Sequence, residues 1–184
     1  MKRFVGNIAS TAVMAALMGW GTAGTAGAQE YPQEADVASP EAIVTATYAA
    51  IARAPGENYD WERFASLFLP GAMLIPNTEQ RNGQFDVLSV QDFIDWIDQF
   101  TVPIIGTDQD RGFSEDGISN TTERFGDIAH VFSTYEKHFW GDDQNLGRGI
   151  NTFQLVFNEG RWWIVSIVWD EESGAGPIPE KYLP

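Results

Sequence analysis

The spacing of apolar residues changes along the chain from a helical period to an alternating one. Between residues 39 and 100, apolar side chains recur every three or four positions in three separate runs. From residue 112 onwards they alternate with polar side chains, and turn signals at Gly126-Asp127 and Asn158-Glu159-Gly160 interrupt the alternation. Helices followed by a strand meander predict an α+β domain in which helices cover one face of a curved antiparallel sheet.

Each of the three helical runs begins with a residue suited to cap a helix. Ser39 precedes a proline at the first helical position and an acid in the first turn, where both are favourable. Asp60 is expected to cap a short second helix, and Ser89 with Asp92 three residues later approximates a capping box. A short apolar strand at 72–75 separates the second helix from the third. We therefore expect three N-terminal helices.

The alternating region predicts four strands, at residues 118–125, 128–139, 148–157 and 161–169. If both hairpin connections between the last three strands are symmetric and free of bulges, Glu136 lies opposite Asn151. We expect one face of the sheet to be largely apolar and to line the inside of the domain. Its members are His130, Phe132, Thr134, Glu136, Asn151, Phe153, Leu155, Phe157, Trp163, Val165, Ile167 and Trp169.

The opposite face of the predicted sheet is also rich in apolar residues, including Val156, Trp162, Ile164 and Val168. A sheet face in contact with water is normally more polar, and a large exposed apolar patch usually marks a protein interface. We therefore predict a homodimer through this face. The alternative is that the irregular, Gly- and Pro-rich tail at 173–184 covers the patch within one molecule.

The N-terminal segment has the features of a signal peptide. Two basic residues precede an apolar stretch at 8–20 that is too short to span a bilayer, and Ala-Gly-Ala at 26–28 matches a cleavage site. We predict a signal peptide at 1–28, a flexible leader without hydrophobic periodicity at 29–38, and a periplasmic or secreted protein. After cleavage we expect no contact with the membrane. An uncleaved membrane anchor is the alternative.

Composition narrows the possible chemistry. The chain has 26 acidic and 11 basic residues, a formal net charge of −15 and no cysteine. The acidic balance disfavours nucleic acid as a partner, and the lack of cysteine excludes disulfides and thiol catalysis. Asp108, Asp110, Glu115 and Asp116 form an acidic stretch, but their spacing departs from the calcium-loop pattern. We expect no metal and no cofactor.

Three segments carry a resemblance to a known family: DIAHVFSTYE at 127–136, RGINTFQLV at 148–156 and RWWIVSIVWDEE at 161–172. Together with the order of helices, short strand and meander, residues 39–172 resemble the nuclear transport factor 2-like, or SnoaL-like, superfamily. The resemblance implies a cone-shaped α+β barrel, a pocket between the helices and the concave sheet face, and commonly a dimer. The superfamily includes ketosteroid isomerases, scytalone dehydratase, polyketide cyclases and many members without known activity, so the fold fixes no single function.

The resemblance also directs attention to two positions. In the ketosteroid isomerases the general base is an aspartate at the end of the first strand, whereas the matching stretch 72–76 of this chain contains no acid. Tyr48 lies on the first helix, where those isomerases carry a tyrosine that binds an oxyanion. A tyrosine in a helical apolar stripe can equally be a core residue.

The predicted inner face supplies the remaining candidates. Beside Asn151, the Glu136 carboxylate would be desolvated and would hold its proton more tightly, as acid–base catalysis requires. His130 on the same face could donate a proton, accept one or bind a substrate. Trp163 and Trp169 would form flat apolar walls suited to an aromatic or polycyclic ligand. Each of these residues could also have a purely structural role.

Three functions are consistent with this pattern. The leading hypothesis is an exported dimer whose mostly apolar pocket binds a small hydrophobic molecule. The second is a cofactor-free lyase or isomerase with Glu136 or His130 as the acid or base. The third is a non-catalytic interaction module, which a pocket without room for a ligand would favour. The ligand-binding candidates are Tyr48, Asn151, Trp163 and Trp169.

Overall fold

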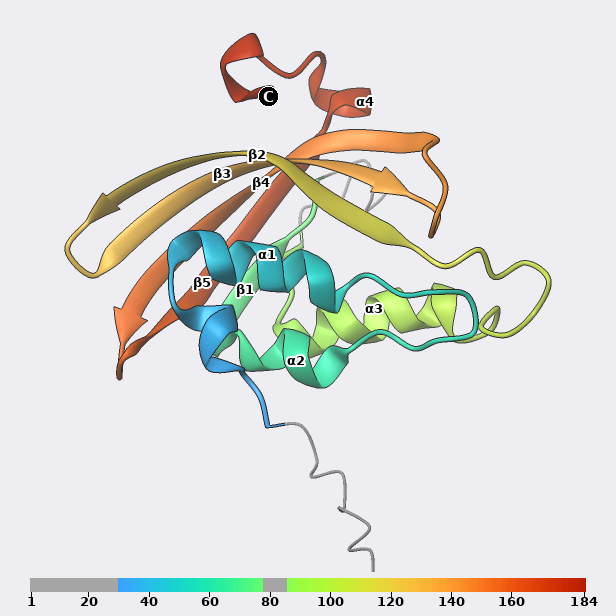
Figure 1. Ribbon diagram of the computed structural model, residues 1–184, viewed down its shortest axis with the longest axis horizontal. Coiled ribbons are helices and arrows are strands. Elements are labelled where there is room, and N and C mark those ends of the chain that lie inside the picture. Colours follow the sequence, from blue (N-terminus) through green and yellow to red (C-terminus); the bar gives the residue numbers. More distant parts are fainter. Residues whose placement is uncertain (1–29, 78–85) are drawn as a thin grey trace, which may run out of the picture.

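The computed structural model describes residues 30–77 and 86–184, so the predicted signal peptide lies outside the described residues. Helices α1 (Pro40–Ala50), α2 (Trp61–Ser66) and α3 (Val90–Thr101) lie on one face of a five-stranded curved sheet (Figure 1). Its strands are β1 (Phe68–Ile75), β2 (Ser114–Phe125), β3 (Ile128–His138), β4 (Asn145–Asn158) and β5 (Arg161–Glu171). Two 3-10 helices, η1 (Glu34–Val37) and η2 (Glu180–Tyr182), and a short helix α4 (Glu172–Ala175) complete the elements. None of the helices in the described part of the chain is long and apolar enough to cross a membrane.

The sheet is mixed rather than purely antiparallel. Its strand order is β1-β5-β4-β3-β2, and β1 pairs with β5 in parallel, while the other three pairs are antiparallel. The prediction of an antiparallel sheet is wrong for β1, because an apolar run shows that a strand is buried but not which strand it pairs with. The helix arrangement also differs from three N-terminal helices, since η1 precedes α1 and α4 follows the sheet, whereas the strand predicted between the second and third helices is present as β1.

The predicted helix caps are present at all three positions. The Ser39 hydroxyl accepts a hydrogen bond from the backbone of the first turn, and the Asp60 carboxylate does the same for α2. Ser89 and Asp92 form a reciprocal capping box at the start of α3. Because each cap of this kind is worth about 1 kcal/mol, these local signals fix where the helices begin.

The pairing of β3 with β4 differs from the predicted register. Ser133, rather than Glu136, lies opposite Asn151, and Glu136 lies opposite Arg148, so the predicted register was displaced by three residues. The reason is that β4 begins already at Asn145 and the ladder shifts between Lys137 and His138. An odd displacement exchanges the two faces of a strand, and the predicted inner and outer faces of β3 are therefore reversed.

The hairpin between β4 and β5 contains a second irregularity. It closes through Glu159 and Gly160, whose φ angles of 52° and 80° are typical of a two-residue turn rather than the predicted three-residue one. Val165 then forms a bulge, and beyond it the residues of β5 point to the predicted faces of the sheet again. Between the turn and the bulge, Trp162 faces the helices and Trp163 faces away from them, opposite to the prediction.

The core lies between the helices and the concave side of the sheet, which we call the inner face. Its most completely buried side chains come from helices and strands alike: Ile43, Val44, Phe64, Leu67, Leu74, Val131, Tyr135, Phe153, Trp162 and Ile164. At roughly 1.5–3 kcal/mol for each large apolar side chain, their burial provides the main favourable term for folding. It also determines which side chains of each strand can reach the interior.

Both ends of the described chain pack on the domain. In the expected flexible leader, Asp36 and Val37 of η1 are buried, and Arg63 forms two hydrogen bonds to the Asp36 carboxylate, at 2.7 and 2.9 Å. The C-terminal tail lies on the sheet face opposite the helices, which we call the outer face (Figure 1). There the Tyr182 ring stacks on Phe132 with ring centroids 5.1 Å apart.

Candidate functional site

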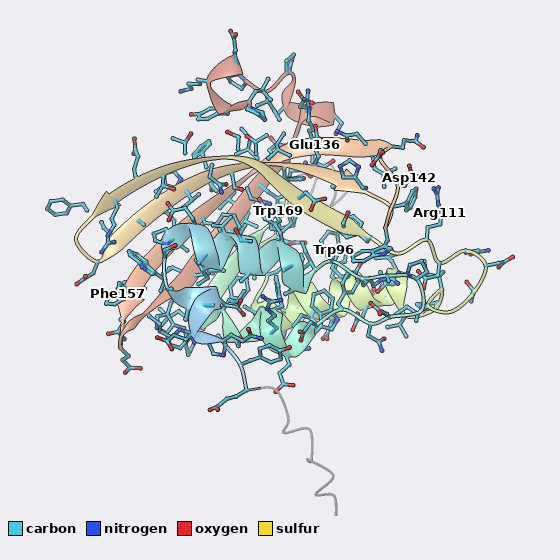
Figure 2. The ribbon with its side chains drawn as sticks, viewed as in Figure 1. Trp96, Arg111, Glu136, Asp142, Phe157 and Trp169 are labelled. Carbon is cyan, nitrogen blue, oxygen red and sulfur yellow. The ribbon has the colours of Figure 1, made fainter. Side chains whose placement is uncertain are left out.

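A cavity of about 270 Å³, which we call the main cavity, lies between the helices and the inner face and is partly open to solvent. Figure 2 shows Trp96 and Trp169 on the helix side of the sheet, where both contribute to its wall. Most of the lining is aromatic or aliphatic. The apolar lining residues are Ile51, Tyr59, Trp61, Phe64, Leu74, Phe93, Trp96, Ile97, Phe113, Phe153, Ile167 and Trp169.

Polar side chains gather at one part of the main cavity, which we call the polar end. They come from α1 and from four neighbouring strands: Tyr48, Glu115, Tyr135, Lys137, Asn151 and Glu171. The sheet register explains the grouping, because Glu115 pairs with Lys137 and Asn151 pairs with Trp169 in adjacent strands. Residues paired across strands project from the same face.

A chain of hydrogen bonds fixes the geometry of the polar end. The Asn151 side-chain amide donates to the Glu115 carboxylate at 3.0 Å and to the Tyr48 hydroxyl at 3.2 Å. The Tyr48 hydroxyl in turn donates to the Ser133 hydroxyl at 2.7 Å. Because one amide contacts both the carboxylate and the phenol, neither can move independently of the other.

Glu115 has the most altered acidity among the carboxyl groups of the main cavity. Burial raises the pKa of its carboxyl to about 7, although the Asn151 hydrogen bond and the charge of Lys137 act in the opposite direction. The carboxyl therefore exists in both protonation states near neutral pH. Lys137 is not its ion-pair partner, since the Lys137 ammonium lies 2.7 Å from the Glu171 carboxylate.

The two tyrosines of the polar end remain protonated at neutral pH. Burial and the neighbouring charge of Glu115 raise the pKa of both Tyr48 and Tyr135 above its ordinary value. Tyr135 is only 1% exposed, and its hydroxyl forms no hydrogen bond with any residue in the described part of the chain. Tyr135 lines the main cavity, so its hydroxyl can donate a hydrogen bond to a molecule there or accept one from it.

Two glycines create the space that these tyrosines occupy. A β-carbon on Gly117 would lie 2.7 Å from the Tyr48 ring, and one on Gly149 would lie 2.5 Å from the Tyr135 hydroxyl. Real β-carbons do not approach other atoms so closely. The absence of a side chain at both positions therefore allows the phenols to pack flat against the strands.

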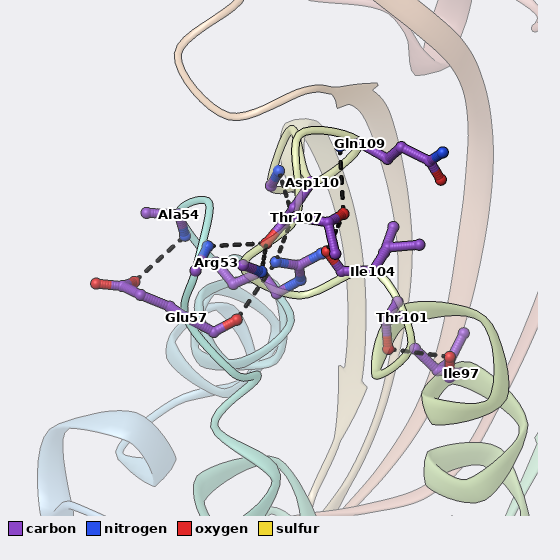
Figure 3. Close-up of polar contacts among 12 residues, drawn as sticks. Arg53, Ala54, Glu57, Ile97, Thr101, Ile104, Thr107, Gln109 and Asp110 are labelled. Carbon is purple, nitrogen blue, oxygen red and sulfur yellow. Dashed lines mark hydrogen bonds and ion pairs between the residues drawn. The ribbon is translucent and has the colours of Figure 1, made fainter.

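A buried ion pair holds two loops beside the main cavity (Figure 3). Arg53 lies 2.8 Å from the Asp110 carboxylate, and the two side chains are 3% and 1% exposed. The same carboxylate accepts hydrogen bonds from the backbone amides of Gly56, Gly106 and Gly112. These amides, with the Arg53 guanidinium, hold the pKa of the Asp110 carboxyl well below its usual range.

This ion pair also positions part of the cavity wall. Arg53 lies over the Tyr59 ring, 5.3 Å from its centroid, and its backbone pairs with that of Phe113. Tyr59 and Phe113 both line the main cavity. The acidic stretch of the sequence thus contributes a structural carboxylate at Asp110 and a cavity carboxylate at Glu115.

A second cavity of about 240 Å³ lies between α1 and β2, on the other side of Tyr48 and Glu115. It is lined by small and polar residues, among them Thr45, Ala49 and Asn120. Glu115 and Tyr48 line both cavities.

The structure brings together three of the predicted site residues. Tyr48, Asn151 and Trp169 all line the main cavity. Asn151 and Trp169 are directly paired across β4 and β5, and Asn151 contacts Tyr48 through its amide. These three positions are consistent with the predicted pocket between helices and sheet.

Glu136 and His130 lie on the outer face, and the prediction that they face the interior is wrong. Figure 2 shows Glu136 on the side of the sheet opposite Trp169, and its carboxylate lies 3.8 Å from the His138 imidazole and 3.8 Å from the Arg148 guanidinium. The His130 ring contacts Phe132, which in turn stacks on the tail. The cause is the three-residue displacement of the register described above.

Trp163 also lies outside the main cavity. Its indole nitrogen donates to the Asn158 backbone carbonyl at 3.1 Å, and the Arg161 guanidinium lies 3.6 Å from the ring centroid. The bulge at Val165 explains this position, because it changes the face to which the first residues of β5 point.

The sequence interpretation missed Glu115, Tyr135, Lys137 and Glu171. The predicted strand at 118–125 leaves Glu115 outside the sheet, although β2 already begins at Ser114. Tyr135 and Lys137 were missed because the incorrect register placed them on the opposite face of the sheet. Glu171 was missed because the last predicted strand ends at residue 169. Helix α3 gave a partly usable signal, because its helical spacing predicts one shared face for Phe93, Trp96, Ile97 and Phe100. The first three line the main cavity, whereas Phe100 is 64% exposed.

The described residues offer no obvious metal centre. Within residues 30–77 and 86–184, no group of three or more His, Asp or Glu side chains is close enough to hold an ion. Asp110 is surrounded by hydrogen-bond donors, and Glu115 is the only acid of the acidic stretch that lines the main cavity.

Comparisons with known proteins show the fold but not the function. No protein-family model and no curated protein matches the chain. Among solved structures, the hub homology domain of CaMKII from Chlamydomonas reinhardtii shares 15% identity over 71% of this chain and 93% of its own, with a TM-score of 0.53. A protein of unknown function with a cystatin-like fold from Nostoc punctiforme shares 14% identity over 72% of this chain and 87% of its own, with a TM-score of 0.50.

An NTF2-like protein of unknown function from Silicibacter pomeroyi is also similar, at 21% identity over 71% of this chain and 91% of its own, with a TM-score of 0.47. At these identities the likeness concerns the fold alone, so the function has to be argued from the site.

Proposed function

We propose that this protein binds a small, mostly apolar organic molecule in the main cavity. The observation that carries the proposal is the cavity itself, in which aromatic walls surround a cluster of ordered polar groups. Ligand sites typically combine an apolar lining with a few placed polar groups that fix orientation. A core that served packing alone would have closed this space, because protein interiors are normally densely packed.

The size of the cavity limits the ligand. An apolar cavity of about 150 Å³ is known to hold benzene, and drug-sized pockets begin at about 300 Å³. A volume of about 270 Å³ therefore suits a molecule with one or two rings. The flat faces of Trp96 and Trp169 favour an aromatic ring over a flexible chain.

Isothermal titration calorimetry with naphthalen-1-ylmethanol tests the proposal. We expect one binding site in the unaltered protein and at least about tenfold weaker binding by Ile97→Trp, which places an indole in the main cavity. Phe100→Trp is the matched control, because Phe100 lies on the same helix but is 64% exposed and does not line the cavity. Absence of binding to the unaltered protein, or equal binding by both variants, would contradict the proposal.

A second candidate is a cofactor-free lyase or isomerase in which Glu115, rather than Glu136 or His130, is the acid or base. The observation that favours it is a carboxyl with a pKa of about 7 beside the unpaired Tyr135 hydroxyl. The test is exchange of the methyl protons of 2-acetylnaphthalene for deuterium in heavy water, followed by NMR. Exchange that the protein accelerates and that Glu115→Gln abolishes would support catalysis, whereas exchange at the uncatalysed rate would exclude it for this ketone.

We also propose that the protein is exported and forms a homodimer through the outer face. Trp162 and Ile164 do not contribute to that face, because they point into the core, and the tail covers its β3 side. Val168 and Met73 remain 38% and 44% exposed on neighbouring strands and support an interface there. Sedimentation equilibrium of the chain from residue 29 tests this: a dimer that Val168→Asp converts to a monomer is expected, and a monomer at all concentrations would contradict it.

A further inference from the structure

The Glu115 side chain lines the main cavity, and the basic residue opposite it on β3, Lys137, has its ammonium group 2.7 Å from a different carboxylate, that of Glu171. In the part of the chain that the structure describes, the Glu115 carboxylate forms no ion pair, and its hydrogen-bond donor is the neutral amide of Asn151. A desolvated carboxylate is costly unless a positive charge compensates it, so a cation placed next to Glu115 would stabilise its ionised form.

The Tyr135 hydroxyl is a second, independent feature of the same place. The Tyr135 side chain lines the main cavity, and its hydroxyl forms no hydrogen bond with the residues that the structure describes. Glu115 and Tyr135 lie on the adjacent strands β2 and β3 and line the same cavity, since Glu115 pairs with Lys137, two residues along β3 from Tyr135. A molecule at the polar end could therefore contact an acceptor carboxylate and a phenol together.

The charges around the polar end discriminate between kinds of ligand. An anionic group at the polar end would be repelled by the carboxylates of Glu115 and Glu171. The ammonium of Lys137 is already paired with the Glu171 carboxylate. A cationic group would supply the charge that Glu115 lacks. The aromatic rings of the lining also favour a cation, since their faces carry partial negative charge.

We propose that the ligand of the main cavity carries a protonated amine next to a flat apolar ring, and that Glu115 is the counter-ion of that amine. This inference rests on the proposed function and specifies its ligand class. The ammonium group donates hydrogen bonds to the Glu115 carboxylate and to the Tyr135 oxygen. The ring occupies the aromatic part of the cavity beside Trp96 and Trp169.

The preference of the main cavity for an amine should depend on pH. The charged or titratable groups that face Glu115 from the surrounding elements are Tyr48 on α1, Asp116 on β2, Tyr135 and Lys137 on β3, and Glu171 on β5. Both tyrosines remain protonated throughout the neutral range. The preference for an amine should therefore follow the ionisation of Glu115, and be strong at pH 8 and weak at pH 5.5.

The test compares two probes of the same size, naphthalen-1-ylmethylamine and naphthalen-1-ylmethanol, by isothermal titration calorimetry. At pH 8 we expect the unaltered protein to bind the amine at least about tenfold more tightly than the alcohol. Glu115→Gln should reduce this ratio to about one, because the amide cannot act as a counter-ion. Glu123→Gln is the matched control, since Glu123 is exposed on the same strand, and it should retain the ratio.

The outcomes separate the two proposals. If neither probe binds, the proposed function fails; if the alcohol binds as tightly as the amine, only the inference about the amine fails. A preference for the amine that survives Glu115→Gln would also overturn it. If Glu115→Gln does not fold, the unaltered protein alone tests the inference. Its preference for the amine over the alcohol has to decrease from pH 8 to pH 5.5, and an unchanged preference would contradict the role of Glu115.

Discussion

The side-chain amide of Asn151 donates a hydrogen bond to the Glu115 carboxylate across 3.0 Å, and this contact joins the β4 and β2 strands across β3. The same amide reaches Tyr48 on α1. One residue at the centre of the sheet thus sets the positions of an acid and a phenol that border the main cavity.

The Tyr48 hydroxyl connects Asn151 to Ser133 within the buried cluster. Tyr48→Phe should lower the free energy of unfolding by about 1–2 kcal/mol, because two buried polar groups lose a partner. Urea denaturation measures the change. Tyr182→Phe on the tail is the control and should change stability by less than about 0.5 kcal/mol; equal effects of the two variants would argue against the network.

The raised pKa of Glu115 makes stability depend on pH. Its pKa rises from an ordinary value of 4.5 to about 7 in the folded state, so the folded protein binds the proton more tightly than the unfolded chain. This stabilisation is complete below pH 4.5 and is lost as pH rises towards 7. Relative to Glu115→Gln, which resembles the protonated form, the unaltered protein should lose up to about 3 kcal/mol between pH 4.5 and pH 8.

Guanidinium denaturation at both pH values measures this difference. Glu123→Gln provides the comparison, because Glu123 is an exposed acid of the same strand. A stability difference between Glu115→Gln and the unaltered protein that stays constant from pH 4.5 to pH 8 would show that Glu115 is not desolvated in the folded state.

The ion pair of Arg53 with Asp110 should be far more important for stability than the exposed pair of Arg111 with Asp142 (Figure 2). Arg53→Ala leaves a buried carboxylate without its cation and should cost about 3–5 kcal/mol. Arg111→Ala removes a pair whose side chains are 53% and 35% exposed, and should cost less than about 1 kcal/mol. Thermal unfolding distinguishes the two, and similar losses would contradict the assigned role of Arg53.

The fit of Tyr48 against Gly117 can be measured by a double-mutant cycle. Gly117→Ala should destabilise the protein by about 1–3 kcal/mol, because the added methyl group would lie 2.7 Å from the Tyr48 ring. In a Tyr48→Ala background the same change should cost much less, since the ring is absent. Identical costs in both backgrounds would show that the constraint at residue 117 lies elsewhere.

The sequence was sufficient to predict the main helices and strands, but it was not sufficient to predict how the strands pair. Capping at Ser39, Asp60 and Ser89 is encoded by neighbouring residues, so those predictions are confirmed. Strand register depends on bulges and on the length of the connection, and neither leaves a clear mark in the hydrophobic pattern. A displacement of three residues was enough to exchange Glu136 for Glu115 as the acid of the cavity.

The only predicted site residues that line the main cavity are therefore ones whose placement did not depend on the β3–β4 register. Tyr48 was placed by a helix stripe, and Asn151 and Trp169 share a face because the bulge at Val165 compensates for the shorter turn. His130 and Glu136 depended on the register of β3 and lie on the outer face. Long-range contacts such as that of Glu115 with Asn151, 36 residues apart, cannot be obtained from local periodicity.

A crystal structure of the protein with naphthalen-1-ylmethylamine tests the central claim most directly. The account predicts the bicyclic ring in the main cavity, against Trp96 and Trp169, with its nitrogen about 3 Å from the Glu115 carboxylate. A ring bound on the outer face, or a main cavity closed by the movement of those tryptophans, would contradict it.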